Sequence, residues 1–209
     1  MSLILFDYDG VLADTLADML RFAQEACDDL GVQHTVSETD LRELDVMSFA
    51  MLGRACGVPE ERVDEFVRRC TEKFATRKSP PAIFPGLAEV VRQLAQTHPL
   101  VVVTGNTEGN VRAFLKAHGL DGCFRAVYGL DMPGSKVEKI LMAKSQSAAD
   151  DQVVYMIGDS VSDVRAAKAA DVKSIVVSWG HQSAERLIGA KPDHIVGRPE
   201  ELIAIARGT

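Results

Sequence analysis

The sequence predicts an α/β protein whose core is a doubly wound parallel sheet. Short apolar runs without alternation are typical of parallel strands that are covered on both faces. Such runs occur at Leu3–Phe6, Leu100–Val103, Val153–Ile157 and Ile175–Val177. From about residue 86 onward they alternate with helix-like stretches, as in successive βαβ units. The segment Thr15–Ser79 breaks this rhythm, because it has helical periodicity and no buried-strand run.

Weaker apolar runs add two strand candidates to the sheet, at Ala126–Tyr128 and His194–Val196. Apolar residues at helical spacing predict the intervening helices. These helices are expected at Leu87–Gln96, Glu108–His118, Val137–Ser145 and Val161–Ala169.

The break in rhythm predicts a small α-helical cap domain inserted into the core. We expect residues 1–14 and 82–209 to form the core domain and residues 15–81 to form the cap. The first cap helix should begin after Asp14 or Thr15 and end near Gly31. The last should cover Glu60–Arg77, and the proline-rich segment 78–86 should be a stiff return linker.

Composition excludes several classes of partner. The 209 residues are 46% apolar and 25% charged, which suits a globular protein with a substantial core. A net charge of -7 and the lack of a long basic run argue against nucleic acid or membrane as a partner. No signal-like segment precedes Leu3, so we expect a cytoplasmic protein. The four cysteines lack zinc or Cys-x-x-Cys spacing and are expected to be reduced thiols.

Polar residues follow three of the predicted strands. Asp7-Tyr8-Asp9-Gly10 follows the first, and Gly10 allows the chain to turn there. Thr104-Gly105-Asn106 offers a hydroxyl and free backbone N–H groups, which suit a phosphate. Asp159 ends a third strand, and Asp163 follows on the first turn of a helix. Each motif alone also fits an ordinary loop or a helix cap.

Their coincidence is the stronger signal, because the carboxyl ends of parallel strands meet at one edge of a sheet. Carboxylates gathered there would repel one another and raise each other's pKa unless a cation neutralised them. Oxygen ligands of this kind favour Mg²⁺ over zinc or copper. The sequence therefore predicts a magnesium site at this edge.

With these motifs in order, the sequence resembles the haloacid dehalogenase superfamily of phosphatases, which has a Rossmann-like core. The motifs are Asp7-Tyr8-Asp9-Gly10, Thr104, Lys136 and the segment 158–163, and the resemblance covers nearly the whole chain. The helical insert is similar to the cap of phosphoglycolate phosphatases and β-phosphoglucomutases. An acid at Asp9 fits chemistry on phosphate esters rather than dehalogenation.

The resemblance implies a role for each core residue. Asp7 would attack phosphorus to form an aspartyl-phosphate, and Asp9 would protonate the leaving oxygen and then activate water. Thr104 would hold the transferring phosphoryl group. Lys136 would neutralise charge, although Lys139 or Lys144 competes for this role because the family's usual proline does not follow Lys136.

The same resemblance implies the ligands. Mg²⁺ would be held by the Asp7 carboxylate, the Asp9 backbone carbonyl and Asp159. Asp163 would orient these ligands without binding the ion itself. The neighbours of Thr104 and one cap residue are further candidates for binding the substrate's phosphate. They are Gly105, Asn106 and Arg42.

The residues and the resemblance together imply a Mg²⁺-dependent phosphatase that hydrolyses a small organic phosphate monoester, phosphoglycolate-like or a sugar phosphate. A phosphomutase of the β-phosphoglucomutase type and a phosphate-binding protein with little activity remain alternatives. Trp179-Gly180 is expected to shape the rim of the site, and His181 to be an exposed loop residue without a catalytic role. The sequence does not indicate an oligomeric state.

Overall fold

The computed structural model describes residues 1–146 and 153–208. The chain divides into two compact units. Residues Met1–Asp14 and Pro80–Thr209 make up one, here called the core unit, and Thr15–Ser79 the other, here called the helical unit. Both crossings between the units fall at or beside the segments in which the sequence predicts boundaries.

The core unit is built on a six-stranded sheet of parallel strands in the order β5-β4-β1-β6-β7-β8. The strand nearest the N-terminus lies inside the sheet, so its carboxyl end is flanked by the ends of β4 and β6. The strands are β1 (Leu3–Phe6), β4 (Leu100–Val103), β5 (Ala126–Tyr128), β6 (Val154–Gly158), β7 (Lys173–Val177) and β8 (His194–Val196).

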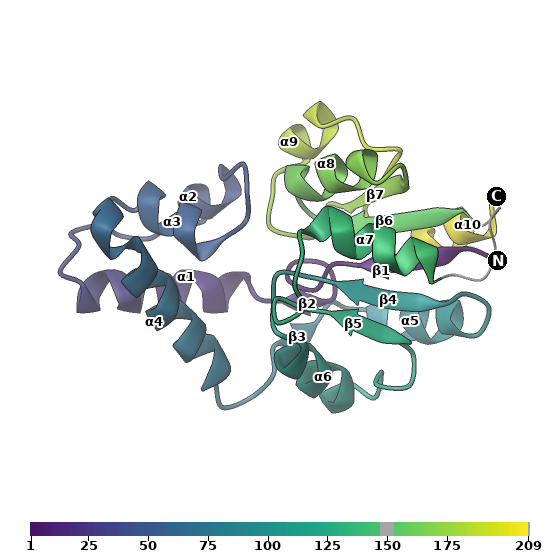
Figure 1. The fold of residues 1–209 in the computed structure, drawn as a ribbon, viewed down its shortest axis with the longest axis horizontal. Coiled ribbons are helices and arrows are strands. Elements are labelled where there is room, and N and C mark those ends of the chain that lie inside the picture. The colour runs from purple at the N-terminus through teal and green to yellow at the C-terminus, as the bar shows by residue number, and fades with distance from the viewer. Residues whose placement is uncertain (147–152, 209) are drawn as a thin grey trace. The chain divides into compact units, whose positions relative to one another are not determined.

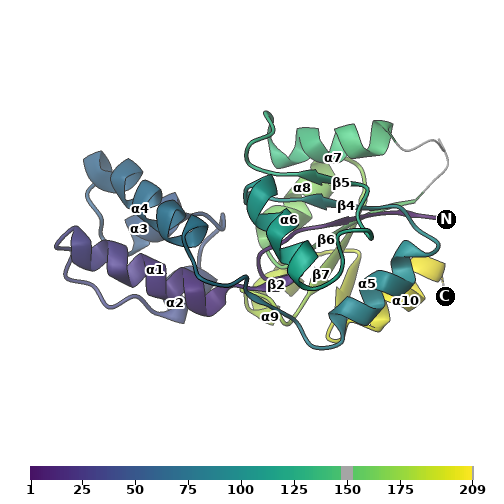
Figure 2. The same cartoon turned by 90° about the horizontal axis from the view of Figure 1, so that it is seen from below.

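Helices cover both faces of this sheet. Successive side chains of a strand point to opposite faces, and in β1 the side chains on both faces are buried. In β1, Ile4 and Phe6 pack with α5, α6 and α10, whereas Leu3 and Leu5 pack with α7 and α8. Figures 1 and 2 show the helices on their two faces. The helices are α5 (Leu87–Ala95), α6 (Glu108–Ala117), α7 (Lys136–Ser145), α8 (Val161–Ala169), α9 (Ala184–Gly189) and α10 (Glu201–Arg207).

The two stretches that lead out of and back into the core unit pair with each other. Strands β2 (Ala13–Asp14) and β3 (Ala82–Ile83) form a two-stranded antiparallel ribbon. The return segment is therefore partly a strand rather than only a stiff linker. Its prolines flank the short strand, where the lack of an N–H group is tolerated.

The helical unit has an apolar core of its own. Its elements are α1 (Leu16–Asp29), α2 (Glu38–Arg42), α3 (Phe49–Ala55), the 3₁₀ turn η1 (Glu60–Arg62) and α4 (Val63–Ala75). Phe22 of α1 packs edge-on against Phe74 of α4, with ring centroids 4.9 Å apart. Phe66 is fully buried and lies so close to Gly53 of α3 that a Cβ there would sit 2.8 Å from its ring. Cys27, Cys56 and Cys70 are buried free thiols, as the sequence predicts.

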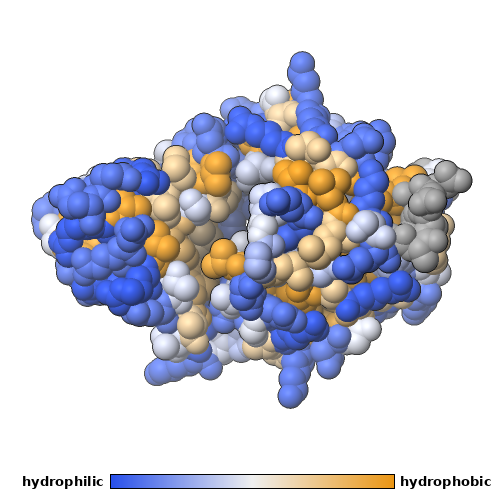
Figure 3. Space-filling view, in the orientation of Figure 1, coloured by the Kyte–Doolittle hydropathy of each residue, from blue (hydrophilic) through white to orange (hydrophobic). Residues whose placement is uncertain are grey.

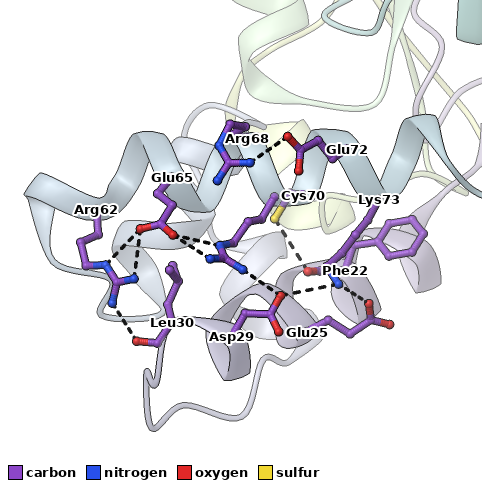
Figure 4. Close-up of polar contacts among 11 residues, drawn as sticks. Phe22, Glu25, Asp29, Leu30, Arg62, Glu65, Arg68, Cys70, Glu72 and Lys73 are labelled. Carbon is purple, nitrogen blue, oxygen red and sulfur yellow. Dashed lines mark hydrogen bonds and ion pairs between the residues drawn. The ribbon is translucent and has the colours of Figure 1, made fainter.

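Ion pairs lie on the surface of this unit. Figure 4 shows the pairs that link α1 to α4, among them Lys73 with Glu25 at 2.8 Å. Arg68 and Glu72 form an exposed i,i+4 pair along α4, also at 2.8 Å. The face of the helical unit in view in Figure 3 is mostly hydrophilic. Exposed pairs contribute little, so burial of the apolar faces is what stabilises the unit.

The predicted strands and helices of the core are confirmed with small shifts at their ends. Strand β7 begins two residues before the predicted Ile175, and α7 begins one residue earlier, at Lys136. In the helical unit, η1 occupies the first residues of the predicted Glu60–Arg77 helix, and α4 ends at Ala75. In the part of the chain that the structure describes, no helix has the length and apolar character to cross a bilayer.

Burial, not surface charge, should determine the stability of the helical unit. We expect Phe66→Ala to lower the free energy of unfolding by about 3–5 kcal/mol, because it removes a large side chain and leaves a cavity. Arg68→Ala should cost about 0.5 kcal/mol or less, because its ion pair is exposed. Urea unfolding followed by circular dichroism measures both, and similar costs for the two variants would contradict this account.

Candidate active site

The first acidic pair is placed by the turn after β1. Tyr8 is fully buried and packs edge-on against Phe114 of α6, with ring centroids 5.1 Å apart. Its carbonyl oxygen accepts hydrogen bonds from the backbone N–H groups of the next residues, including Leu12 and Ala13 at 3.0 Å. Because Tyr8 is anchored in the core, the turn presents Asp7 and Asp9 at the carboxyl edge of the sheet.

Lys136 meets the first of these carboxylates. It is the first residue of α7, whose start is fixed by a capping box between Ser135 and Glu138. Its ammonium nitrogen lies 2.6 Å from Asp7 Oδ2 and 2.5 Å from Asp163 Oδ1. Lys139, by contrast, is buried and donates to the Gly129 carbonyl oxygen at 2.7 Å. Of the three lysines considered from sequence, the structure thus brings Lys136 to the acids.

Asp163 is held at the start of α8 by a second capping box. Its Oδ2 accepts from the Ser160 hydroxyl at 2.7 Å and from the backbone N–H groups of Asp159 and Ser160 at 3.2 and 3.1 Å. Its Oδ1 contacts Lys136. Both oxygens are therefore engaged, which fits a residue that organises its neighbours.

Asp159 is nearly inaccessible and is enclosed by a segment that follows β7. Its Oδ2 accepts from the His181 backbone N–H at 2.7 Å and lies 3.3 Å from the His181 Nδ1. A Cβ at Gly10 or Gly180 would collide with the Asp159 side chain, so both positions need glycine. Trp179 donates from Nε1 to the Val11 carbonyl oxygen at 3.3 Å, which ties this segment to the turn after β1.

The expectation that His181 lies in an exposed loop was wrong. Its exposed fraction is 3%, and its ring packs against the Asp159 carboxylate rather than lying in an exposed loop. Gln182 is also buried, and its Oε1 accepts from the Val161 backbone N–H at 2.7 Å. A polar Gly-His-Gln sequence after a strand looks like a surface loop, and only the tertiary fold turns it inward.

The loop after β4 supplies the third group of polar side chains. Thr104 is buried, and its hydroxyl oxygen accepts from the Asn106 backbone N–H at 3.0 Å. The Asn106 side chain donates from Nδ2 to Asp9 Oδ2 at 3.1 Å. Gly105 borders open space, because a Cβ there would meet no described heavy atom within 4 Å.

Uncompensated negative charge distinguishes this edge of the sheet. Burial raises the pKa of Asp7 from 3.8 to about 6, with Asp163 and Asp9 adding to the rise and Lys136 opposing it. Burial, together with Asp163 and Asp7, also raises the pKa of Asp159 well above its ordinary range. Burial alone would lower the pKa of Lys136, yet the Asp163 and Asp7 carboxylates raise it. One ammonium group is thus shared among several buried acids.

This arrangement fits a divalent cation. Asp7, Asp159 and Asp163 each offer an oxygen, and these oxygens lie within 4.8 Å of one another. The donors are all hard carboxylate oxygens, which suit Mg²⁺. Asp9 Oδ1 is buried and has no hydrogen-bond partner within residues 1–146 and 153–208. Asp7, Asp159 and Asp163 are therefore brought together, and the charge of Asp9 is near enough to add to the rise in the pKa of Asp7.

Arg42 belongs to the helical unit, at the end of α2. Its guanidinium forms an ion pair with Glu38 at 3.0 Å along the same helix. Its binding of a substrate phosphate stays a prediction.

The family model that matches the chain is described as haloacid dehalogenase-like hydrolase, and the match covers residues 4–177. That range includes the first acidic pair, Thr104, Lys136, Asp159 after β6 and Asp163 in α8. This chain belongs to the haloacid dehalogenase-like hydrolase family. The resemblance inferred from the motifs is thereby confirmed, and the protein is an enzyme of that hydrolase family.

Relatives match over nearly their whole length. A phosphoglycolate phosphatase of Synechococcus elongatus is 26% identical over 204 residues, covering 97% of this chain and 96% of its own. The probable phosphatase IndB of Dickeya dadantii is 30% identical over 213 residues, covering 98% and 93%.

A solved haloacid dehalogenase-like hydrolase from Streptococcus pneumoniae superposes with a TM-score of 0.86 at 21% identity, covering 98% of each chain. This likeness confirms the fold class predicted from the strand rhythm.

The raised pKa of Asp7 predicts a pH-dependent stability difference in the metal-free protein. Because the pKa is about 6 when folded and 3.8 ordinarily, the folded state binds more protons between these values, and stability falls as pH rises through this window. Asp7→Asn removes that loss. The variant should be more stable than wild type at pH 7.5 by on the order of 3 kcal/mol.

Chelated samples of both proteins, unfolded in urea at pH 7.5 and at progressively lower pH, test this expectation. The advantage of Asp7→Asn should shrink as the pH approaches 4.5. An advantage that is independent of pH, or a destabilised variant at pH 7.5, would show that the buried charge of Asp7 carries no such cost.

Proposed function

We propose that this phosphatase hydrolyses a small organic phosphate monoester through an aspartyl-phosphate formed on Asp7. The observation that carries the proposal is the contact of one ammonium group, on Lys136, with both Asp7 and Asp163 beside the buried Asp159. A nucleophile among acids, a charge-neutralising lysine and hard oxygen ligands are the parts that phosphoryl transfer requires. The names of the relatives, phosphatases in both cases above, support the same class of reaction.

Asp7 is the proposed nucleophile. One of its carboxylate oxygens forms a bond to phosphorus while the bond from phosphorus to the ester oxygen breaks. The Tyr8 backbone N–H donates to Asp7 Oδ1 at 2.7 Å, and Lys136 contacts Oδ2, so the carboxylate is held before the substrate arrives. Lys136 also keeps negative charge on Asp7 tolerable in a buried setting.

Asp9 is the proposed proton donor and acceptor. Its carboxyl proton passes to the leaving oxygen as the ester bond breaks, which leaves Asp9 as a carboxylate. In the second step that carboxylate takes a proton from water while the water oxygen attacks phosphorus and releases Asp7. Asn106 occupies Oδ2, whereas Oδ1 has no hydrogen-bond partner among the described residues, so Oδ1 is assigned to both transfers.

The loop after β4 is proposed to hold the phosphoryl group. Thr104 uses its oxygen to accept from the Asn106 backbone, so its hydroxyl proton is left to donate to a phosphoryl oxygen. The open position at Gly105 leaves room for a phosphoryl group beside the backbone.

The cofactor proposed for this site is Mg²⁺, held by Asp7, the Asp9 backbone carbonyl and Asp159, with Asp163 as support. When bound, the ion would supply positive charge against the phosphoryl oxygens. The closeness of the Asp7, Asp159 and Asp163 oxygens and the raised pKa values of Asp7 and Asp159 support the carboxylate members of this set.

We assign the helical unit as a cap that contributes to substrate choice. Arg42 is its candidate for contacting an anionic group of the substrate. The phosphoglycolate phosphatase from Synechococcus elongatus supports a small, doubly anionic ester as the substrate class. A phosphomutase would use the same core residues, and it differs in returning the phosphoryl group to a sugar instead of to water.

Phosphate release from a panel of small phosphate monoesters tests the function. With Mg²⁺, the wild type should release phosphate from at least one ester, and a chelator should abolish release. Asp7→Asn should lower kcat by roughly 10³-fold or more, because it removes the nucleophile.

Two results would oppose the hydrolase reading. Turnover of a sugar phosphate without net phosphate release would favour the mutase. No turnover of any ester, with retained binding of phosphate, would favour a binding protein.

The two lysines of α7 offer a matched comparison. Lys136→Ala should lower kcat by about 100-fold or more, because it removes the cation at Asp7. Lys139→Ala should mainly lower stability, because this lysine donates to the Gly129 carbonyl oxygen away from the acids. Initial rates and thermal unfolding measure both variants. An equal loss of kcat in the two variants would show that the assignment of the essential cation to Lys136 is wrong.

A further inference from the structure

Asn106 reaches from the loop after β4 to the turn after β1. Its Nδ2 donates to Asp9 Oδ2 at 3.1 Å, although the two residues are 97 positions apart in the chain. We infer that Asn106 is a positioning residue that fixes which oxygen of Asp9 carries the proton for the leaving group. This inference rests on the proposed function, because it assigns Asp9 as the proton donor.

The orientation of the Asn106 amide is set by its neighbours. Its Oδ1 accepts from the Thr107 backbone N–H at 2.9 Å and from Asn110 Nδ2 at 2.9 Å. A backbone N–H is only a donor, so a rotated amide would direct an NH₂ group against it. The oxygen of the amide is therefore turned toward α6 and the NH₂ group toward Asp9.

The backbone of Asn106 is fixed as well. Its N–H donates to the Thr104 hydroxyl oxygen at 3.0 Å, and its carbonyl oxygen accepts from the Leu130 N–H at 2.7 Å. These bonds fasten the residue to the ends of β4 and β5. The amide group is thus presented to Asp9 from a rigid base, which is what a positioning residue needs.

A donor at Oδ2 determines the state of the other oxygen. When Asp9 is protonated, Oδ2 faces an N–H group and must act as the acceptor, so the proton sits on Oδ1. Oδ1 is the oxygen without a hydrogen-bond partner in the described parts of the chain. Asn106 therefore directs the acidic proton to Oδ1, the Asp9 oxygen that no described donor occupies and that can give the proton to the leaving oxygen.

This arrangement affects one event in the reaction. As the ester bond breaks, the electron pair stays on the leaving oxygen, and that oxygen takes the proton from Asp9 Oδ1. An alkoxide is a poor leaving group and depends on this proton, whereas 4-nitrophenolate is stable enough to leave without it. Losing Asn106 should therefore impair alkyl esters far more than 4-nitrophenyl phosphate.

The test compares kcat/KM of the holoenzyme for two substrates, 4-nitrophenyl phosphate and the alkyl phosphate that the wild type hydrolyses best. kcat/KM reports on steps up to departure of the leaving group. For Asn106→Ala and Asn106→Asp, we expect about a 10- to 50-fold loss with the alkyl ester, as part of the 10²- to 10⁴-fold available from general acid catalysis. With 4-nitrophenyl phosphate, the loss should stay within about 3-fold.

Thr107→Ala is the matched control. The Thr107 side chain accepts from the Asn110 backbone at the start of α6, so the variant disturbs the same loop and helix while keeping the backbone N–H that orients Asn106. It should affect both substrates equally. Equal losses for both substrates in Asn106→Ala, as expected of a phosphate-binding residue, would overturn the inference. Failure of the wild type to hydrolyse either substrate would instead overturn the proposed function.

Discussion

Repulsion among buried carboxylates is the constraint on which the rest of the site depends. Asp7, Asp159 and Asp163 bring their oxygens within 4.8 Å of one another, and Lys136 is the cation that touches two of them. Burial makes each negative charge more costly, as the raised pKa values of Asp7 and Asp159 record. The fold must hold these groups together against that repulsion, and the proposed divalent cation would neutralise the remaining negative charge.

Short local structures at the ends of the strands hold these acids and Lys136 in place. Buried Tyr8 anchors the turn that carries Asp7 and Asp9, and capping boxes fix Lys136 and Asp163 at the starts of two helices. The segment after β7 encloses Asp159 through His181. Each of these local structures is common in proteins. The order of the parallel strands places the side chains that they hold at one edge of the sheet.

Sequence reasoning succeeded where the signal was local. The buried runs of β1 and β4 and the Asp7/Asp9 spacing are visible in the chain because strands and turns leave periodic or compositional traces. The burial of His181 and the bond from Asn106 to Asp9 leave no such trace, because they join segments distant in the chain. The β2/β3 ribbon was likewise missed, since each of its strands is too short to show a pattern.

A phosphoryl group on Asp7 during turnover would be direct evidence that Asp7 is the nucleophile. Enzyme mixed with Mg²⁺ and its best ester, quenched in acid within milliseconds and digested, is analysed by mass spectrometry. We expect a phosphorylated peptide that contains Asp7. Hydroxylamine should remove its phosphoryl group, and the Asp7→Asn variant should give no such peptide. A phosphoryl group on another residue, or turnover of the Asp7→Asn variant at the wild-type rate, would contradict the account.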